Sequence, residues 1–337
     1  MTPPPSPSAA SGRPAAPART VFFGSGAFAV PILAILVAQP AVEVVAVVAP
    51  PDKPAGRHGR PRPVPVAAEA RRLGLPLLQP DLVRAPETAA AIEAMAPDLG
   101  VLADFGRIVP GSILGIPSHG ILNVHPSLLP RHRGATPVAA TILAGDPIAG
   151  VTVMQMDAGL DTGPILGGRS WPILGTETTP ELEARAAKDG AALLRELLEP
   201  YLRGERVAVP QDGSAATLTR PLRRSDGLLE PGRPAADLER QVRAYLPWPG
   251  SHVETEAGRL AVLRAALGTR AADDRTGELV ADNGGLALVA ADGRLRLLDV
   301  QPAGGRPMSG EAFRRGHPSV VGRLVTGAAR PPEGRAE

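Results

Sequence analysis

Short apolar runs alternate with helical stretches from Thr20 onwards, and this alternation constrains the fold more than any other feature of the sequence. The first repeat consists of an apolar run at 21–23, a helical stretch that ends at Leu36 and a β-branched run at 42–48. Short strands separated by helices indicate a mostly parallel sheet with helices on both faces. We therefore expect an α/β, Rossmann-like domain. Its further strands are expected at 75–78, 99–103, 120–124 and 150–156, and its further helices at 88–95 and 179–203.

The composition of the sequence changes after Gly204, where polar and turn-forming residues replace the apolar runs. Beyond this segment, one helix is expected at 235–245, followed by short strands with turn sequences at 282–285 and 291–293. This pattern predicts a smaller C-terminal β-barrel domain. The division that follows is a disordered tail at 1–18, a first domain at 19–205, a linker at 206–222, a second domain at 223–325 and a tail at 326–337.

Composition narrows the possible chemistry and the possible partners. No apolar run reaches the roughly 18 to 20 residues of a membrane helix, and the first residues lack the apolar stretch of a signal peptide. The sequence therefore predicts a cytoplasmic protein. The absence of cysteine excludes disulfides and thiolate metal sites, and no metal is expected. Because the net charge is only +2, a polyanionic partner must be bound by a local cluster of charge.

Three polar side chains are expected to meet at the carboxyl edge of the predicted sheet. Asn123 and His125 lie two residues apart at the end of a strand, so both point to the same side. Asp161 follows a later strand in a turn-rich segment. Ligands of open α/β sheets bind at this edge. Taken singly, each residue is more often structural than catalytic, but together they offer an amide, an imidazole and a carboxylate to one small substrate.

Two long motifs contain these residues. The first is Asn-x-His-x-Ser-Leu-Leu-Pro-x-x-x-Gly at 123–134, and the second is Gly-Val-Thr-x-x-x-Met-Asp-x-Gly-x-Asp-Thr-Gly at 150–163. With them, the chain resembles the folate-dependent formyltransferase family, and within it the branch that acts on methionyl-tRNA. The resemblance extends from about 20 to 322, and further matching segments lie at 51–57, 247–250 and 301–309.

The resemblance implies formyl transfer from 10-formyltetrahydrofolate to an amine. Asn123 and His125 would then donate hydrogen bonds to the formyl oxygen as negative charge develops there. Asp161 would accept the proton of the attacking amine, or hold His125 in its useful orientation. The residues that match the tetrahydrofolate-binding loop of the family are Ser127, Leu128, Leu129 and Pro130.

A basic segment at 50–65 is the expected contact with the second substrate, which the resemblance identifies as methionyl-tRNA of the initiator type. This segment is rich in glycine and proline, so a solvated surface loop is the alternative interpretation. In the family the matching loop enters the tRNA acceptor end, and Arg57 occupies the position of its arginine. The basic residues that would bind tRNA are Lys53, Arg57, Arg60 and Arg62.

The C-terminal barrel resembles the OB-like domain of the family, which would hold the acceptor stem through phosphate contacts. No protein partner is implied. The arginines expected to contribute near the start of this domain are Arg220, Arg223, Arg224, Arg240 and Arg243.

Two other functions remain open on the sequence alone. Residues 24–29 read Gly-x-Gly-x-x-Ala, and with Asp52 as a ribose ligand they are compatible with a nicotinamide-dependent oxidoreductase. A sibling formyltransferase that acts on a sugar amine is the closer alternative. The sequence also departs from the family at Ser25-Gly26-Ala27, where Thr-Pro and an acid are usual, at Asp104, and at His132, where tryptophan is common.

Overall fold

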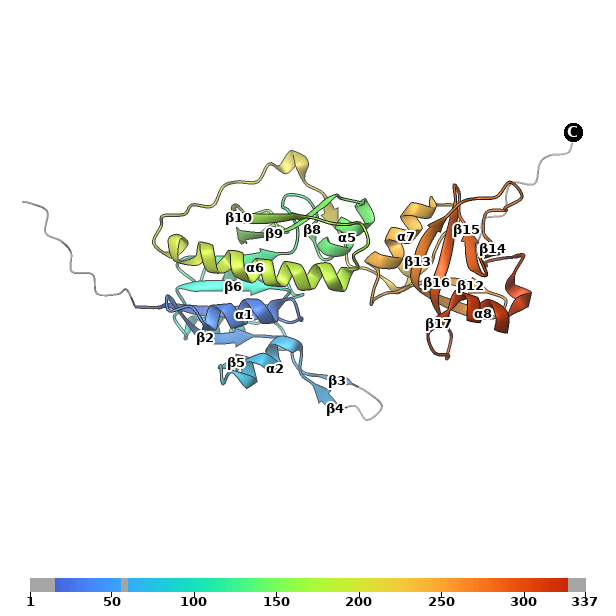
Figure 1. Cartoon of the computed structure of the whole chain (residues 1–337). Coiled ribbons are helices and arrows are strands. Elements are labelled where there is room, and N and C mark those ends of the chain that lie inside the picture. Colours follow the sequence, from blue (N-terminus) through green and yellow to red (C-terminus); the bar gives the residue numbers. More distant parts are fainter. Residues whose placement is uncertain (1–15, 56–59, 327–337) are drawn as a thin grey trace, which may run out of the picture. The chain divides into compact units, whose positions relative to one another are not determined.

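The computed structural model describes residues 16–55 and 60–326. Its first layer is a seven-stranded sheet with the strand order β10-β9-β7-β6-β1-β2-β5 (Figure 1). Strands β1, β2, β5, β6 and β7 pair in parallel, whereas β7 and β9 are antiparallel. The mostly parallel sheet is therefore confirmed. Its strands are β1 Ala18–Gly24, β2 Val42–Val48, β5 Leu77–Leu78, β6 Leu99–Ala103, β7 Ile121–His125, β9 Ile148–Gln155 and β10 Ile165–Pro172.

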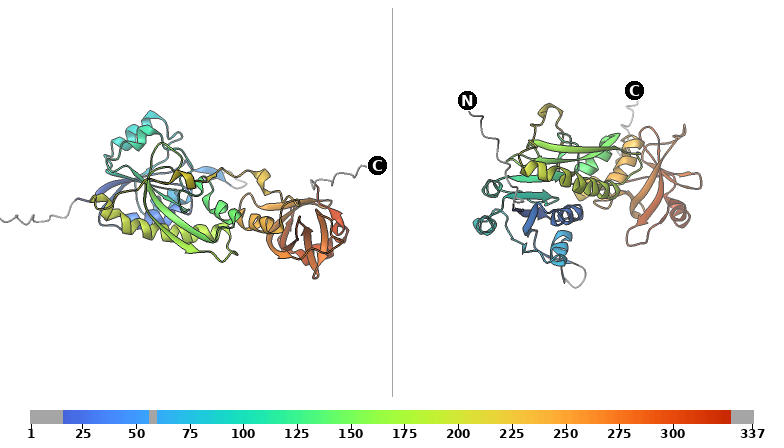
Figure 2. Two further views of the ribbon diagram at one scale, coloured as in Figure 1. Left: turned by 90° about the horizontal axis from the view of Figure 1, so that it is seen from above. Right: turned by 60° about the vertical axis from the view of Figure 1, so that its left-hand side comes forward.

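Helices cover both faces of this sheet, as expected. Figure 2, in its left view, shows α3 and α4 on the side of the sheet opposite to α6. Ile92 of α3 and Ile113 of α4 are fully buried against Val21 and Phe23 of β1. The helices are α1 Ala29–Val37, α2 Pro65–Arg72, α3 Pro86–Glu93, α4 Gly111–Leu114, α5 Pro137–Ala144 and α6 Thr179–Leu202.

Four of the elements named so far are absent from the sequence prediction, namely α2, α4, α5 and β10. Helix α5 reads Pro-Val-Ala-Ala-Thr-Ile-Leu-Ala. A short and almost wholly apolar run has no polar face, so periodicity does not identify it as a helix. Strand β10 alternates weakly and contains two glycines, which lower its strand propensity. Helix α5 forms because tertiary neighbours cover it, whereas β10 forms by pairing with β9 at the edge of the sheet.

The C-terminal residues form a curled antiparallel sheet with the order β12-β13-β16-β15-β14-β18, and β17 pairs with β16. Its core contains Leu238 of α7 and Phe313 of α8, packed against apolar residues of the strands. This half-barrel confirms the OB-like prediction. The elements are α7 Ala235–Ala244, β12 Ser251–Thr255, β13 Gly258–Gly268, β14 Glu278–Asp282, β15 Gly285–Val289, β16 Arg294–Pro302, β17 Met308–Ser309, α8 Gly310–Gly316 and β18 Arg323–Leu324.

Several short elements lie outside the two large sheets. Strand β3 (Lys53–Ala55) pairs with β4 (Arg60–Arg62), and β8 (Arg133–Gly134) pairs with β11 (Leu218–Thr219). Single turns of 3-10 helix lie at Gly213–Ala215, Arg224–Gly227 and Pro318–Val320. The predicted tails lie almost entirely outside the residues that the structure describes.

The chain divides into two compact units whose limits differ from the two predicted domains. The first unit comprises residues up to 125 together with 152–168 and 187–211, and the second comprises 126–151, 169–186 and the residues from 212 onwards. Within the second unit, Val138 and Ile142 of α5 form a cluster with Ala244 and Tyr245 at the end of α7. The domain limits at 205 and 223 stay a prediction. In the described ranges, no helix is long and apolar enough to cross a membrane.

Candidate active site

Asn123 and His125 lie on β7, between β6 and β9. Asn123 is opposite Leu102 on one side and Met154 on the other, and His125 is opposite Thr152. Both polar side chains are buried, at 5% exposed for Asn123 and 4% for His125. Buried polar groups need hydrogen-bond partners, and for Asn123 that partner comes from a distant loop.

That loop comprises residues 157–163 and is braced internally. The carboxylate of Asp157 accepts hydrogen bonds from the Gly159 backbone N–H at 3.0 Å and from the Thr162 hydroxyl at 2.7 Å. Asp161 adopts a left-handed backbone conformation with φ of 53°, which is uncommon for a residue with a side chain. A Cβ atom on Gly163 would lie 1.8 Å from the carbonyl oxygen of Gln155, so only glycine fits there.

The three residues named from the sequence meet in this structure. Asn123 Nδ2 donates to Asp161 Oδ1 at 3.2 Å, and His125 Nδ1 lies 3.7 Å from Asp161 Oδ2. The Asp161 side chain is 14% exposed, so it is more accessible than the nearly covered Asn123 and His125. An amide donor, an imidazole and an accessible carboxylate are the groups that acyl transfer to an amine requires.

The segment after β7 is held by its own polar side chains. The Ser127 hydroxyl donates to the Arg131 carbonyl at 2.7 Å, and Ser127 and Leu129 are buried. Leu128 and Pro130 are half-buried. A Cβ atom on Gly150 would lie 2.2 Å from Leu128 Cδ2, so Leu128 packs directly on the backbone of β9. Of the four residues expected in the folate loop, two hold the loop and two offer apolar surface.

His132 stands where the family commonly has tryptophan, and polar contacts hold it in place. Its ring Nε2 lies 2.7 Å from Asp146 Oδ2, and its backbone N–H donates to the Thr217 hydroxyl at 2.8 Å. Arg131 also reaches Asp146, at 2.6 Å. His132 and Arg131 thus share one carboxylate, and this hydrogen-bonded network supports the end of the loop.

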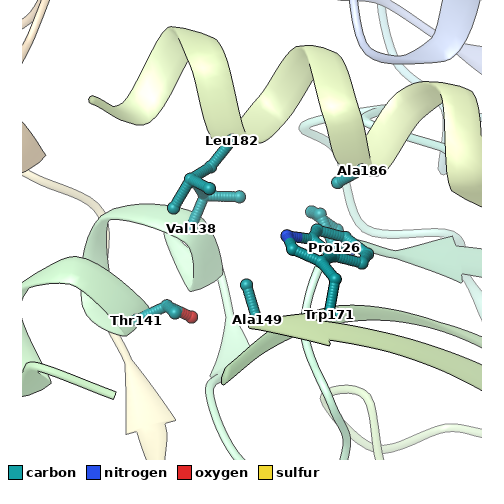
Figure 3. A pocket seen from close by; sticks show the side chains of 8 residues that line it. Pro126, Val138, Thr141, Ala149, Trp171, Leu182 and Ala186 are labelled. Atoms are coloured by element: carbon teal, nitrogen blue, oxygen red, sulfur yellow. The ribbon is translucent and has the colours of Figure 1, made fainter. Parts of the chain in front are cut away.

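A small cavity lies behind Pro126 (Figure 3). Its volume of about 10 Å³ has room for roughly one water molecule and none for a pterin. Figure 3 shows the indole nitrogen of Trp171 on the side of the ring that faces Val138. This buried nitrogen has no hydrogen-bond partner among the described residues. The residues lining the cavity are Pro126, Val138, Thr141, Ala149, Gly150, Trp171, Leu182 and Ala186.

The first turn of the chain is shaped by Asp104. A Cβ atom on Gly26 would lie 1.8 Å from Asp104 Oδ2, so the glycine accommodates the carboxyl group. The two departures from the family pattern are thus complementary, because a residue with a Cβ at position 26 would collide with this side chain. Although Asp104 is exposed, desolvation by the surrounding protein raises its pKa to about 6, while a hydrogen bond from the Gly26 backbone opposes the shift.

Asp52 is committed to contacts within the protein. It forms an ion pair with Arg71 at 2.9 Å and accepts a hydrogen bond from Gln79 Nε2 at 2.7 Å. The Gln79 bond, followed by Arg71, lowers the pKa of this carboxyl group. These contacts disfavour the role of ribose ligand that the oxidoreductase alternative assigns to Asp52.

Three of the four expected tRNA-binding residues, Lys53, Arg60 and Arg62, belong to the two strands of a short hairpin. Lys53 of β3 is opposite Arg62 of β4, and Arg62 is exposed. Arg57 lies outside the described residues. Among the arginines near the C-terminal domain, Arg220 pairs with Asp226 at 2.7 Å, and Arg243 pairs with Glu239 at 2.7 Å. Such pairing within the chain reduces the charge that these two side chains offer to phosphate.

The sequence prediction missed one residue at this site. The Gln211 amide reaches the backbone of the Asp161 loop at 2.9 and 2.7 Å. It lies in the segment expected to be a polar linker, and no motif distinguishes it there. Within the ranges 16–55 and 60–326, no group of three or more His, Asp or Glu side chains is arranged to hold a metal ion.

Comparisons with known proteins agree with this geometry. Residues 18–198 match the formyl transferase family model, and residues 221–318 match the model of the formyl transferase C-terminal domain. Methionyl-tRNA formyltransferase of Roseiflexus sp. (strain RS-1) is 43% identical over 89% of this chain and 93% of its own length. The enzyme of the same name from Halorhodospira halophila is 42% identical over 91% of this chain and 99% of its own.

Solved structures share the fold at lower identity. An N-formyltransferase from Helicobacter canadensis, in complex with folinic acid and dTDP-3-aminofucose, has a TM-score of 0.63 and 15% identity over 83% of this chain and 98% of its own. HypX from Aquifex aeolicus, in complex with tetrahydrofolic acid, has a TM-score of 0.60 and 16% identity over 95% of this chain and 50% of its own.

The sheet, the half-barrel and the Asn-His-Asp arrangement define a formyltransferase with an OB-like C-terminal region. The chain belongs to the formyl transferase family, and its similarity over nearly the full length of curated relatives places it with the methionyl-tRNA formyltransferases. This similarity confirms the resemblance found in the sequence and favours the methionyl-tRNA branch over the sugar-amine and nicotinamide alternatives.

Proposed function

We propose that this chain transfers the formyl group of 10-formyltetrahydrofolate to the α-amino group of methionyl-tRNA. The meeting of Asn123, His125 and Asp161 supports the reaction, and the similarity to methionyl-tRNA formyltransferases supports the substrates. The new bond joins the α-amino nitrogen to the formyl carbon, and the bond between that carbon and N10 of the folate breaks. One proton leaves the amine, and N10 gains one.

Asn123 and His125 stabilise the charge that develops on the formyl oxygen. An amide carries two N–H bonds, of which Asp161 accepts one, so the other is the donor to the substrate. His125 donates through a ring N–H. Donors fixed in advance of the reaction are effective because they do not reorganise as the charge forms, and losing one typically costs about a hundredfold or more in rate.

Asp161 accepts the proton of the amine, directly or through water, and orients His125. Its carboxylate is the most solvent-accessible of the three side chains, and it lies beside both partners. A base that must reach an incoming substrate needs such access. The 3.7 Å distance between Asp161 Oδ2 and His125 Nδ1 supports the second duty, because the carboxylate lies beside the ring that it would orient.

The folate binds at residues 127–130. The half-buried Leu128 and Pro130 provide apolar surface for a flat pterin, while Ser127 and Leu129 keep the loop in shape. Two proteins of this fold are described in complex with tetrahydrofolic acid and with folinic acid. In the sequence this loop begins directly after His125.

Methionyl-tRNA of the initiator type is the second substrate, and formylation prepares it for translation initiation in the cytoplasm. Lys53, Arg57, Arg60 and Arg62 contact its acceptor end. A hairpin that carries basic residues with few apolar anchors suits phosphate contacts. The C-terminal domain at 223–325 holds the acceptor stem, after the linker at 206–222.

Mass analysis of the aminoacyl group tests the reaction. Methionyl-tRNA is incubated with the protein and 10-formyltetrahydrofolate, and the released amino acid is expected to gain one formyl group. A dTDP-linked amino sugar, supplied in parallel, is expected to stay unmodified. Formylation of the sugar with none of methionyl-tRNA would reject this substrate assignment.

The catalytic roles are tested by substitution. Asn123→Ala, His125→Ala and Asp161→Ala are each expected to lower kcat by about a hundredfold or more, with circular dichroism unchanged. Near-native rates in all three variants would disprove the roles assigned here.

The hairpin is tested through salt dependence. Arg57→Gln, Arg60→Gln and Arg62→Gln are each expected to raise the KM for tRNA while leaving folate binding unchanged. Each substitution that removes an ionic bond to phosphate should reduce the slope of log KM against log salt by about one. Equal effects on tRNA and folate would contradict a tRNA-binding hairpin.

A further inference from the structure

The side chain of Gln211 bonds to the loop that carries Asp161. Its Nε2 group donates to the carbonyl oxygen of Asp161 at 2.9 Å and to that of Gly163 at 2.7 Å. Gln211 follows Asp161 by 50 residues in the chain, so only the folded structure brings them together. Both N–H bonds of the amide are directed to backbone atoms, and this fixes the amide in one orientation.

The chain before Gln211 is fastened to the start of β10. Ile165 and Val209 exchange two backbone hydrogen bonds, at 2.7 and 2.8 Å. The Arg206 guanidinium donates to the Leu166 carbonyl at 3.0 Å. These contacts hold residues 206–209 in register with the strand that follows the Asp161 loop. The hydrogen-bonded segment 206–209 therefore fixes the backbone just before Gln211.

The loop itself needs such support. Asp161 has a φ of 53°, and residues in this region of conformational space persist when their surroundings hold them there. The two carbonyls that Gln211 binds lie on either side of Thr162. An amide that holds both sets the path of the backbone through Thr162 and thereby the direction in which the Asp161 side chain points.

Gln211 also touches the strand behind the site. Its Nε2 lies 3.9 Å from Met154 Sδ, and Met154 is the residue opposite Asn123 in the pairing of β7 with β9. One side chain thus contacts both the loop of Asp161 and the neighbour of Asn123. These two residues are joined by the 3.2 Å hydrogen bond of the site.

We propose that Gln211 is a positioning residue for the formyl transfer reaction, acting through Asp161. It holds the Asp161 backbone so that the carboxylate stays beside Asn123 and His125, and it does not touch the substrates itself. The inference rests on the proposed function for its kinetic consequences, whereas the clamp itself can be measured without any reaction.

The test uses the full chain with Gln211→Met, which keeps the length of the side chain and removes both donors. Hydrogen–deuterium exchange of peptides covering 157–163 is expected to speed up, because the loop loses its outer bonds. The kcat is expected to fall by about tenfold to a hundredfold, as misplacement of a catalytic group by about 1 Å can do. The Kd for tetrahydrofolate and the KM for methionyl-tRNA should stay within about threefold of the wild type.

A double-mutant cycle separates positioning from a merely structural role. In an Asp161→Asn background, Gln211→Met should cause no further loss of kcat, because the group that it positions no longer works. Losses that multiply would overturn the proposal, as would a Gln211→Met variant with wild-type exchange and wild-type kcat. If the wild type forms no formylmethionyl-tRNA, the proposed function fails, while faster exchange at 157–163 would still establish the clamp.

Gln241 provides a matched control. Its Nε2 donates to the backbone carbonyls of Asp226 and Leu228, at 3.3 and 3.1 Å, and it is 1% exposed. Gln241→Met removes the same chemistry from a place that lies outside the catalytic residues. It is expected to lower Tm while leaving kcat and exchange at 157–163 unchanged. A fall in kcat equal to that of Gln211→Met would show that the kinetic effect is general destabilisation and would overturn the positioning role.

Discussion

The fold changes the pKa of Asp104, the residue that directly follows β6. Desolvation by the surrounding protein raises its pKa from 3.8 to about 6, although the residue is exposed at the surface. The folded chain therefore binds this proton more tightly than the unfolded chain does, and stability falls as the pH rises from about 4 to about 6. Above that range the cost of ionising this partly desolvated carboxyl group is fully present.

Asp104→Asn should remove this cost. The variant is expected to gain on the order of a few degrees in Tm over the wild type at pH 7.5, with a smaller gain at pH 4, where the wild-type carboxyl group is also neutral. Thermal melts at both pH values measure the difference. A gain of the same size at both values would mean that ionisation of Asp104 is not its source.

At the scale of single elements, the loop 157–163 depends on a close approach between two backbones. Gly163→Ala would place a Cβ atom 1.8 Å from the Gln155 carbonyl, and a backbone atom cannot move aside cheaply. We expect the loop to shift and kcat to fall by about a hundredfold, as measured with saturating substrates. The fall in kcat should be accompanied by only a small fall in Tm, because the rest of the sheet is unaffected.

Gly213→Ala is the control for that substitution. A Cβ atom there would meet nothing within 4 Å, so neither kcat nor Tm should change. If both glycine variants behaved alike, the steric account of the Asp161 loop would be wrong.

At the scale of the whole molecule, the C-terminal region completes part of the apolar core. Val138, Ile142 and Leu182 pack in one cluster with Ala244 and Tyr245, and the Thr179 hydroxyl donates to the Ala244 carbonyl at 2.7 Å. A chain that ends after Gln211 would expose these side chains to water. Burying three large aliphatic side chains is worth on the order of 5 kcal/mol.

A fragment of residues 1–211 is accordingly expected to melt well below the full chain and to bind a hydrophobic dye. Scanning calorimetry and dye fluorescence measure both effects. A fragment that melted at the temperature of the full chain, without binding dye, would indicate that the first predicted domain is independent of the second.

Most of the fold and half of the site geometry were predictable from local patterns. Alternating apolar and helical segments predicted the parallel sheet, and turn sequences predicted the C-terminal half-barrel, because both follow from the period of neighbouring residues. Asn123 and His125 were placed together for the same reason, since residues two apart on a strand share a face. The long motifs then assigned the family and its reaction.

Only the tertiary structure decided the contacts between distant segments. The sequence already predicted that Asp161 would meet Asn123, but it did not predict that Gln211 contacts Asp161 across 50 residues or that the carboxyl group of Asp104 fills the space left by Gly26. Helix α5 belongs with the C-terminal unit although it lies in the first predicted domain. Such contacts depend on how whole elements pack, and packing leaves no periodic signal in the residues themselves. Sequence alone thus determined the class of fold and reaction, and folding determined what holds the Asp161 carboxylate in place.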